Sequence, residues 1–299
     1  MRVVAISGAG RSGSTFLSLL LSEHPDVFNL GQLRHLWRSY ENAESCSCGD
    51  TLVNCPLYGD IVPDVHSRPG VAPPERMHAL GKAFIEDADR QQDWSDEDVR
   101  RQLSERHKDY LAAMRDVIGA VAGRTRCKVM VDTSKDPATA LAFELLPGIE
   151  LFLLNLVRDP RAVAVSWQRR KGSARNTLGR VLDWKQRQRR LERWRPALGE
   201  RFLTLRYEDL AAAPATTIRA VAERCGIPLP ADLFVEPDHA VVDWGTQHLY
   251  PPANEHVLAA QESDIRVSVR EGWKDSKYRW IHTLTQLLAG GQMRDYYER

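Results

Sequence analysis

The stretch that decides the fold is Arg2 to Leu21, RVVAISGAGRSGSTFLSLLL. Its four apolar residues Val3 to Ile6 are typical of a short buried strand, and the apolar run ending at Leu21 is long enough to begin a helix. The loop between them is rich in Gly and Ser, which predicts a strand–loop–helix unit. In such a unit, backbone N–H groups and a helix N-terminus converge on a phosphate. We therefore expect phosphate binding, and a glycine-rich turn that holds nothing is the alternative.

Residues 8 to 15, GAGRSGST, fit the P-loop pattern G-x-x-x-x-G-K-[ST] at all positions but one. Ser14 stands where the pattern has the lysine that reaches the β- and γ-phosphates. Arg11, three residues earlier, is the nearest cation. The loop therefore predicts a phosphate site whose charge comes from other residues than in an ordinary ATPase.

Composition bounds the class of protein. A chain of 299 residues is long enough for one large α/β domain or two small ones. Its net charge of +1 excludes a globally basic nucleic-acid binder, so we expect no nucleic-acid partner, although a local basic patch stays open. No apolar run approaches the roughly 18 residues of a membrane span, and the Gly/Ser loop interrupts the N-terminal apolar run before it resembles a secretory signal. We expect a cytoplasmic protein.

The chain has five cysteines, an odd number that argues against a disulfide framework. Three of them, Cys46, Cys48 and Cys55, lie close together in the sequence. The C-x-C spacing suits a tetrahedral zinc site less well than C-x-x-C, and no second cysteine pair follows. We expect structural packing or a local disulfide. Zinc, with His66 or His35 as a fourth ligand, is the alternative.

Five apolar segments read as strands and alternate with helical segments. This order predicts an α/β three-layer sandwich, in which a mostly parallel five-stranded sheet has helices on both faces, as in P-loop NTPases. We expect one domain over residues 1–299, with a cysteine-containing and helical insertion at about 41–125. The expected strands are 3–6, 27–30, 127–131, 151–157 and 202–205.

Inside the insertion, residues 41–75 show weak periodicity and are expected to be irregular. A helix is expected over about 74–89. Another is expected to begin near Ser95, whose hydroxyl can cap it, and to run to about Ala122. The pair could cover a cleft.

Ligands of such sheets bind beyond the carboxyl ends of the strands, and the motifs of this chain fall there. Arg158 and Ser166 are eight residues apart, across a strand end and the start of a helix. A guanidinium and a hydroxyl at this spacing can converge on a small anion such as a second phosphate. Arg161 and Arg170 are alternatives for the cation. Arg158 could instead pair with an acid, either Asp159 or Glu208.

These motifs resemble the PAPS-dependent sulfotransferase family, in its bacterial branch. GAGRSGST, DTSK (132–135), LVRDPRAVAVS (156–166) and RYEDL (206–210) occur in the family's order over about residues 1 to 226. HPDVFNLGQLRHLW (24–37) resembles the acceptor-side segment of tyrosyl-protein and bacterial sulfotransferases. CSCGDTLVNCPLY (46–58) resembles a cysteine motif of a bacterial branch. The resemblance implies an enzyme that moves a sulfuryl group in line, without metal, from 3′-phosphoadenosine 5′-phosphosulfate (PAPS) to an acceptor hydroxyl.

The resemblance also implies roles for residues. The loop would hold the 5′-phosphosulfate, Arg158 and Ser166 the 3′-phosphate, and Tyr207 would lie near the adenine. Arg11 and Lys135 would stabilise charge on the leaving phosphate oxygen. The acceptor would be a small molecule, a glycan or a lipid with a hydroxyl group. The loop residues concerned are Gly10, Arg11, Ser12, Gly13, Ser14 and Thr15.

The sequence departs from its relatives at the expected catalytic base. Related enzymes usually have Gly-Glu where this chain has Gly31-Gln32, and an amide cannot accept a proton at neutral pH. We therefore predict that Gln32 contacts the acceptor and that His35, which titrates near neutrality, is the base. The alternative is that His35 faces solvent; the base is then Asp132, His24 or His239, or the acceptor is acidic enough to need little help.

Two other functions compete with this prediction. A P-loop kinase is disfavoured because Ser14 replaces the lysine and Asp132 is the only clear candidate to hold Mg²⁺ at the end of an apolar strand. A non-catalytic protein that binds 3′,5′-ADP is suggested by the missing glutamate at Gln32. Consumption of ATP with Mg²⁺ would favour the first, and tight 3′,5′-ADP binding without turnover the second.

Overall fold

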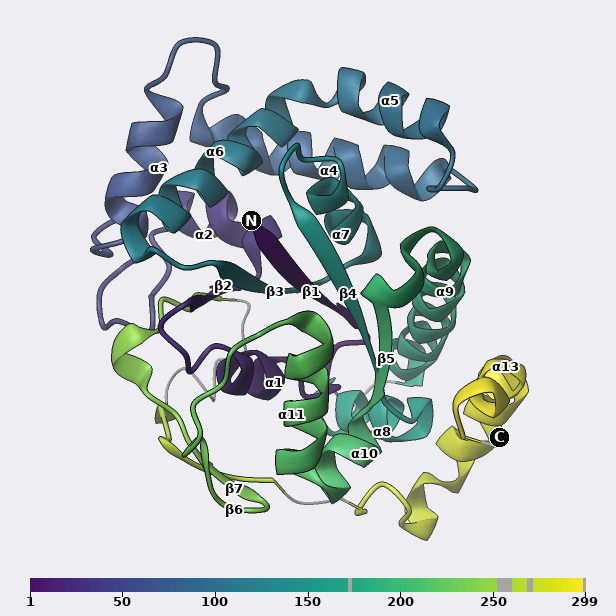
Figure 1. Ribbon diagram of the computed structural model, residues 1–299. Helices are drawn as coiled ribbons and strands as arrows, with labels where there is room; N and C mark the ends of the chain where they lie inside the picture. The colour runs from purple at the N-terminus through teal and green to yellow at the C-terminus, as the bar shows by residue number, and fades with distance from the viewer. Residues whose placement is uncertain (172–173, 252–259, 268–270, 298–299) are drawn as a thin grey trace.

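The computed structural model describes residues 1–171, 174–251, 260–267 and 271–297 (Figure 1). A five-stranded parallel sheet forms its centre, with the strand order β2-β3-β1-β4-β5. All five expected strands are present. They are β1 (Arg2–Gly8), β2 (Val27–Gly31), β3 (Val129–Lys135), β4 (Glu150–Val157) and β5 (Phe202–Arg206).

Strand β3 continues beyond the expected end at residue 131. The DTSK motif therefore forms the end of the strand instead of following it. The pairing of β1 with β3 shifts register between Ala5 and Ser7, which brings Lys135 opposite Ser7. Lys135 thus lies beside the residue that precedes the glycine-rich loop.

Side chains of the strands alternate between two hydrophobic cores, as expected for a sheet covered on both faces. Val3 and Ala5 of β1 belong to one core, while Val4 and Ile6 belong to the other. The first core includes α7 (Pro137–Glu144) and α9 (Ala174–Leu198). The second includes α1 (Ser14–Leu21), α10 (Tyr207–Ala212) and α11 (Pro214–Cys225). The three-layer sandwich predicted from the sequence is confirmed.

The chain between β2 and β3 is more regular than expected. It contains η1 (Leu33–His35), α2 (Leu36–Glu41), α3 (Tyr58–His66), α4 (Pro74–Arg90), α5 (Glu97–Arg106) and α6 (Lys108–Thr125). The expectation of an irregular segment over 41–75 was wrong for α3, whose buried face completes the first core. Because these helices share that core with the sheet, the insertion packs as part of the same hydrophobic unit.

The single helix expected from Ser95 to Ala122 was wrong in two respects. It is divided into α5 and α6 at His107, whose ring lies edge-on against Phe84 and is hydrogen-bonded to Asp87, both on α4. The cap is Asp96, whose carboxylate accepts the N–H groups of residues 98 and 99. The Ser95 hydroxyl donates to Asp93 instead.

A third core joins α8 (Pro160–Lys171) and α9 to the C-terminal helix α13 (Arg279–Tyr297). Figure 1 shows α9 and α13 on the side of the sheet where β5 lies. The remaining elements are short. They are η2 (Gly199–Arg201), η3 (Trp244–Thr246), η4 (Ser276–Tyr278) and an antiparallel sheet of β6 (Phe234–Glu236), β7 (His239–Val241) and β8 (Asp264–Arg266). Within the described ranges, no helix combines the length and apolar character that crossing a membrane requires.

Candidate functional site

The glycine-rich loop connects β1 to α1, and two of its glycines have backbone angles that other residues rarely adopt. Gly8 has φ +145°, and a Cβ there would lie 2.3 Å from the carbonyl oxygen of Leu156. Gly13 has φ +86° and directly precedes α1, with a Cβ position 3.0 Å from the Tyr207 ring. Arg11 also has a positive φ, 73°, which is uncommon for a residue with a side chain. The loop is therefore held in a compact turn at the N-terminus of α1.

Arg158 and Ser166 meet the loop through Arg11. Arg158 Nη1 donates to the Arg11 carbonyl oxygen at 2.6 Å, and Arg11 Nε donates to Ser166 Oγ at 3.2 Å. The Arg158 guanidinium also lies over the Tyr207 ring, 4.1 Å from its centroid. The structure thus brings together four residues that the sequence selected separately. Arg158 and Ser166 each contact Arg11 in this arrangement.

The acids suggested as partners of Arg158 have other partners. Asp159 forms a two-pronged ion pair with Arg161, at 2.6 Å for the closest pair of atoms. Glu208 accepts the Asp159 N–H and the Tyr297 hydroxyl. Arg161 is thereby tied to its neighbouring carboxylate, and the side chain of Arg170 lies outside the described residues.

Two buried polar atoms at this site have no hydrogen-bond partner among the described residues. They are Ser12 Oγ, on a side chain that is 1% exposed, and Arg158 Nε. Buried polar groups normally have a hydrogen-bond partner. Two buried atoms without one in the same region are characteristic of a site where a polar ligand supplies the missing hydrogen bonds. A hydroxyl and a guanidinium N–H beside a P-loop are suited to phosphate oxygens.

Lys135 adds a second cation at the end of β3. Its Nζ donates to the Thr133 carbonyl at 3.2 Å, and Arg187 Nη1 donates to the Lys135 carbonyl at 2.7 Å. Burial, and then the nearby Arg187 and Arg34, lower the pKa of Lys135 to about 8. The ammonium group is still mostly protonated at pH 7, and it lies in a less polar environment than a surface lysine.

Asp132 holds the segment that carries Gln32. Its carboxylate accepts the Leu33 N–H at 3.0 Å, and the N–H and hydroxyl of Ser134 at 2.9 Å each. The neighbouring Thr133 hydroxyl donates to the Gly31 carbonyl. Burial raises the pKa of Asp132 to about 6. This network, which sequence reasoning missed, fixes Gly31, Gln32 and Leu33 against the end of β3.

The predicted acceptor residues lie together on this segment. Gln32 is 6% exposed, and its carbonyl accepts the His35 N–H at 2.8 Å. His35 Nδ1 is buried and has no partner among the described residues. Burial, and then the positive charges of Arg34, Arg38, His78 and Lys135, together lower the pKa of His35 to about 3. His35 is therefore neutral at pH 7, with a ring nitrogen that is not engaged by those residues.

Two of the alternative bases lie elsewhere. His24 lies between the end of α1 and the start of β2, at the amino end of this strand, whereas the loop follows the carboxyl end of β1. Its Nδ1 accepts the Asp26 N–H. His239 is in β7 and is hydrogen-bonded to Asp264 at 2.9 Å. Among the described contacts, neither histidine is hydrogen-bonded to the glycine-rich loop.

Trp167 is a further residue of this site that sequence reasoning did not assign to it. A Cβ on Gly10 would lie 3.3 Å from the Trp167 ring, and the Arg180 guanidinium lies 4.6 Å from the centroid of that ring. The signal in the sequence was an aromatic residue directly after Ser166. The Trp167 ring lies beside the loop, and a side chain at position 10 would have to displace this ring slightly.

The cysteine segment packs in the first core through Cys46 and Cys55, but it does not form the disulfide that was the other expectation. All five cysteines are free, and the Sγ atoms of Cys46 and Cys55 are 3.8 Å apart, so the expected local disulfide is not formed. His66 is not a neighbour of the thiols, since its Nε2 accepts the Trp37 indole N–H at 2.8 Å. The histidine beside Cys46, Cys48 and Cys55 is His248. Nothing in the sequence around His248 indicated this position.

The comparisons with known proteins agree with this geometry. The sulfotransferase family model matches residues 4–231, which include the loop, DTSK, RDP and RYEDL motifs. The sulfotransferase domain of the Synechococcus PCC 7002 olefin synthase is similar in structure, with a TM-score of 0.54 at 16% identity, over 97% of this chain and 94% of that one. Sulfotransferase STF9 from Mycobacterium avium has a TM-score of 0.52 at 13% identity, over 99% of this chain and 77% of that one. Comparison with curated protein sequences found no significant match.

At such identities the two structures establish the shared fold alone. The family model goes further, because it matches the sequence itself over more than two thirds of the chain's length. It spans every strand of the parallel sheet apart from the first two residues of β1. The chain belongs to the sulfotransferase family.

Proposed function

We propose that this protein transfers a sulfuryl group from PAPS to the hydroxyl of an acceptor. The observation that carries the proposal is the linked set of Arg158, Arg11 and Ser166 around a glycine-rich turn, with Ser12 Oγ and Arg158 Nε left without partners. A single phosphate would need only the loop. A second cationic group beside it, from the end of β4, suits a ligand with two separated anionic groups.

The 3′-phosphate is assigned to Arg158 and Ser166. The Arg158 guanidinium is held in place by the Arg11 carbonyl and by the Tyr207 ring, so little side-chain freedom is lost when it binds an anion. Because Arg158 covers one face of Tyr207, the adenine contact proposed for this residue falls to its remaining surface. The 5′-phosphosulfate is assigned to residues 10–15 and the N-terminus of α1.

Arg11 and Lys135 are assigned to the charge that develops on the leaving phosphate oxygen. Both positive groups flank the loop: Arg11 within it and Lys135 opposite Ser7. Cations held in a poorly solvated site stabilise such charge more than they would in water. The chain's contribution to the reaction is then mainly positioning and electrostatic stabilisation, as in phosphoryl transfer.

Gln32 and His35 are assigned to the acceptor. The amide of Gln32 can orient a hydroxyl by hydrogen bonding, and His35 Nδ1 is free of partners among the described residues to accept its proton. The low pKa of His35 reflects burial and the cations around it. A bound polyanionic sulfuryl donor offsets these cations and raises the pKa, so His35 becomes a stronger base when the site is loaded.

A kinase is disfavoured by Asp132 as well as by Ser14. Each carboxylate oxygen of Asp132 already accepts at least one hydrogen bond, from Leu33 or Ser134, and the group supports the Gln32 segment. It is therefore poorly placed to coordinate Mg²⁺ for a nucleoside triphosphate.

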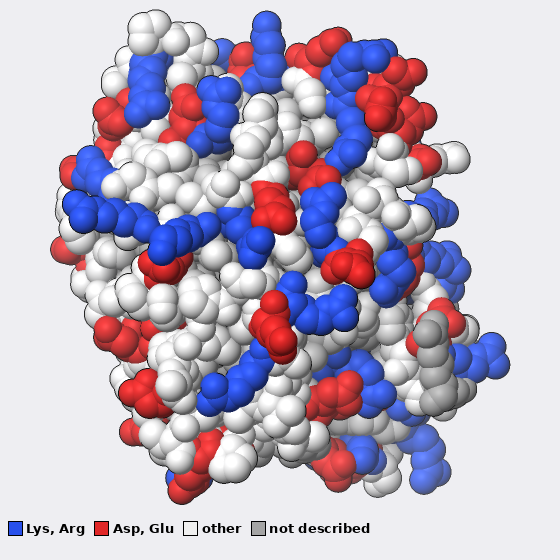
Figure 2. Space-filling model, in the orientation of Figure 1, with Lys and Arg blue, Asp and Glu red and all other residues white. Residues whose placement is uncertain are grey.

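We assign the protein a cytoplasmic, PAPS-dependent activity on a small-molecule, glycan or lipid hydroxyl. On the face shown in Figure 2, Lys and Arg lie among Asp and Glu.

The test is a transfer assay with radiolabelled PAPS and representative phenols, glycans, lipids and peptides, without added Mg²⁺. The expected result is a labelled product with at least one hydroxyl class and release of equimolar 3′,5′-ADP. Consumption of ATP with Mg²⁺ and no use of PAPS would establish the kinase. Tight 3′,5′-ADP binding without turnover on any class would establish the non-catalytic protein.

A further inference from the structure

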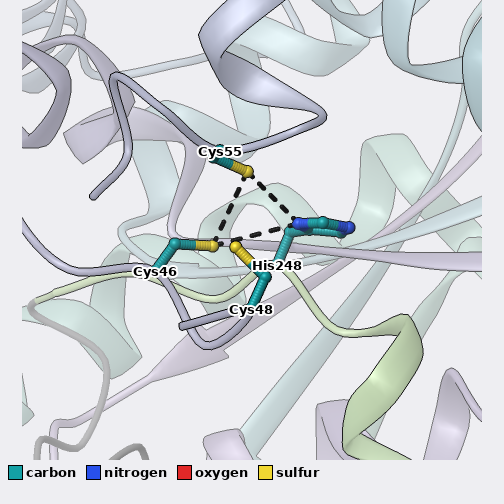
Figure 3. A group of neighbouring side chains, drawn as sticks. All are labelled: Cys46, Cys48, Cys55 and His248. Carbon is teal, nitrogen blue, oxygen red and sulfur yellow. Dashed lines mark hydrogen bonds between the residues drawn. The ribbon is translucent and has the colours of Figure 1, made fainter. Parts of the chain in front are cut away.

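Three cysteines and one histidine converge at a point away from the glycine-rich loop (Figure 3). Cys46, Cys48 and Cys55 come from the loop between α2 and α3, and His248 comes from the segment after η3. The four ligand atoms all lie within 4.8 Å of one another. Figure 3 shows the three sulfur atoms and the imidazole turned toward a common centre.

The spacing of the Cys46, Cys55 and His248 ligand atoms is close to that around one tetrahedral ion. With Zn–S bonds of about 2.3 Å and Zn–N bonds of about 2.0–2.1 Å, ligand atoms at tetrahedral angles are about 3.5–3.8 Å apart. The Sγ atoms of Cys46 and Cys55 are 3.8 Å apart. His248 Nδ1 lies 3.9 Å from Cys46 Sγ and 3.2 Å from Cys55 Sγ. A disulfide would need an S–S distance of about 2.05 Å and would use only two of the thiols.

The backbone holds the two segments together at the same place. Ser47, between the first two cysteines, donates its N–H to the Leu249 carbonyl at 2.7 Å and its hydroxyl to the Gln247 carbonyl at 2.8 Å. In return, the Leu249 N–H donates to Ser47 Oγ at 2.8 Å. The neighbours of His248 on both sides are thus bound to the residue between Cys46 and Cys48, so the ligands are oriented by protein contacts.

Backbone groups also surround the sulfur atoms. The loop turns tightly after Cys46, with the Gly49 N–H donating to the Cys46 carbonyl and the Cys46 N–H donating to the Asp50 carbonyl. Beside Cys55, the backbone groups of Tyr58 and Leu57 favour the thiolate form of this side chain. Hydrogen bonds to the ligands of a metal orient them and compensate the charge of thiolates.

We propose that Cys46, Cys48, Cys55 and His248 bind one Zn²⁺ ion in a closed, structural site. Three sulfurs and one imidazole in tetrahedral array are a ligand set for zinc, and hard cations such as Mg²⁺ prefer oxygen. Since all four positions come from the chain, the ion has no place for a substrate. It takes no part in sulfuryl transfer, and the expectation of metal-free transfer is a separate claim.

The ion would fasten two segments 193 residues apart, at Cys55 and His248, and so hold the chain beside the acceptor residues. Leu249 and Tyr250 follow directly, and a Cβ on Gly31 would lie 3.3 Å from the Leu249 side chain. The Tyr250 hydroxyl donates to the Leu30 carbonyl at 3.3 Å. We infer that zinc thereby supports the segment Leu249–Tyr250 next to Gln32, and the relevance of this support to the acceptor rests on the proposed function. The metal site itself does not.

The test measures metal in the full-length protein, purified under reducing conditions without a metal-affinity step. Elemental analysis is expected to find one zinc per chain, together with the visible absorption of tetrahedral, thiolate-bound cobalt after replacement by Co²⁺. Cys48→Ser and His248→Ala are expected to lower the zinc content several-fold. Cys127→Ser, a buried cysteine outside the cluster, is the matched control and is expected to keep the full amount.

His248→Cys keeps the proposal testable if the other variants fail to fold. It replaces one zinc ligand by another, so it is expected to bind one ion and to strengthen the sulfur-to-cobalt absorption. A chain without zinc that also takes up none when titrated would overturn the proposal, as would iron in its place or a Cys46–Cys55 disulfide. None of these measurements depends on PAPS, so a failure here is distinct from a failure of the proposed transfer activity.

Discussion

The Arg158 guanidinium contacts the loop and the Tyr207 ring at once, and its Nε is one of two orphan polar atoms in the site. It follows the end of β4 directly, where a side chain reaches over the edge of the sheet toward Arg11. This position steadies the loop through the carbonyl contact. The proposed second role, binding an anion, is separable from it.

We expect Arg158→Ala to weaken binding of 3′,5′-ADP by about 10- to 150-fold, since a hydrogen bond to a charged group contributes about 1.5–3 kcal/mol. Binding of 5′-AMP, which lacks the 3′-phosphate, should change little. Titration calorimetry with both nucleotides measures the difference. Arg161→Ala is the control, because Arg161 is paired with Asp159. Equal losses for the two nucleotides would show that Arg158 only steadies the loop.

We expect His35→Ala to lower kcat by about 10²- to 10⁴-fold, because the proposed role of His35 is to accept the proton of the acceptor hydroxyl. In the free protein its pKa is about 3, so it is deprotonated across neutral pH. In the proposed mechanism, the negative charge of the bound donor is expected to raise this pKa. The acid limb of kcat, which reports the loaded enzyme, should therefore lie at higher pH than that of kcat/KM, which reports the free enzyme.

The competing hypothesis is that Asp132 is the base. Its pKa is about 6 in the free protein. With Asp132 as the base, kcat/KM would fall as the pH drops below about 6 and His35→Ala would leave the profile unchanged. Gln32→Glu distinguishes a third case. If turnover rises in that variant, the chain has lost its general base at position 32 and has not moved it to His35.

At the scale of elements, the helices of the insertion are set by caps and by contacts with α4. The division between α5 and α6 comes at His107, which is 7% exposed and packs against Phe84 and Asp87. Helical periodicity alone continues through this point, since the apolar residues on both sides fall on one face. The break is stabilised by packing across helices, which a periodicity argument does not include.

The cap of α5 provides a direct comparison between neighbouring residues. Asp96→Ala removes the carboxylate that accepts two N–H groups of the first turn, and it is expected to lower the free energy of unfolding by about 0.5–2 kcal/mol. Ser95→Ala is the matched control and should cost less, because its exposed hydroxyl bonds only Asp93. Urea denaturation of both variants tests this. If Ser95→Ala lowered the free energy of unfolding more than Asp96→Ala, Ser95 would be the cap, as the sequence predicts.

At the scale of the whole molecule, a buried carboxylate at the end of β3 couples stability to pH. Burial raises the pKa of Asp132 from 3.8 to about 6. Between these values the folded protein keeps a proton that the unfolded chain has released. Stability from this group is therefore highest below about pH 4 and falls as the pH rises through 6, by up to about 3 kcal/mol.

Asp132→Asn removes this titration, so the comparison isolates it. The stability of the wild type relative to the variant should increase as the pH is lowered from 7 to 4. Denaturant unfolding at several pH values in this range measures the difference. Glu23, whose pKa burial raises to about 7, contributes a slope of the same sign but is present in both proteins. A constant difference across the range would contradict the raised pKa of Asp132.

The sequence by itself determined the sheet and most of the residues that meet at its glycine-rich loop. Short apolar runs such as Val3 to Ile6 identify buried strands from adjacent residues, and the glycines of the loop require backbone angles that are local properties. The order of strands and helices then placed the loop, Lys135 and Arg158 at one edge, because the carboxyl ends of parallel strands share it. Each of these inferences depends on neighbours in the chain.

Tertiary structure alone decided the properties that depend on distant neighbours. His248 joins the three cysteines from 193 residues beyond Cys55, in a segment that carries no periodic signal. Arg11 proved to be the residue that links Arg158 to Ser166. The pKa of His35 is set by burial and by cations from other elements, including Lys135 on β3. Burial, charge environment and ligand convergence are sums over the packed molecule, so no window of adjacent residues contains them.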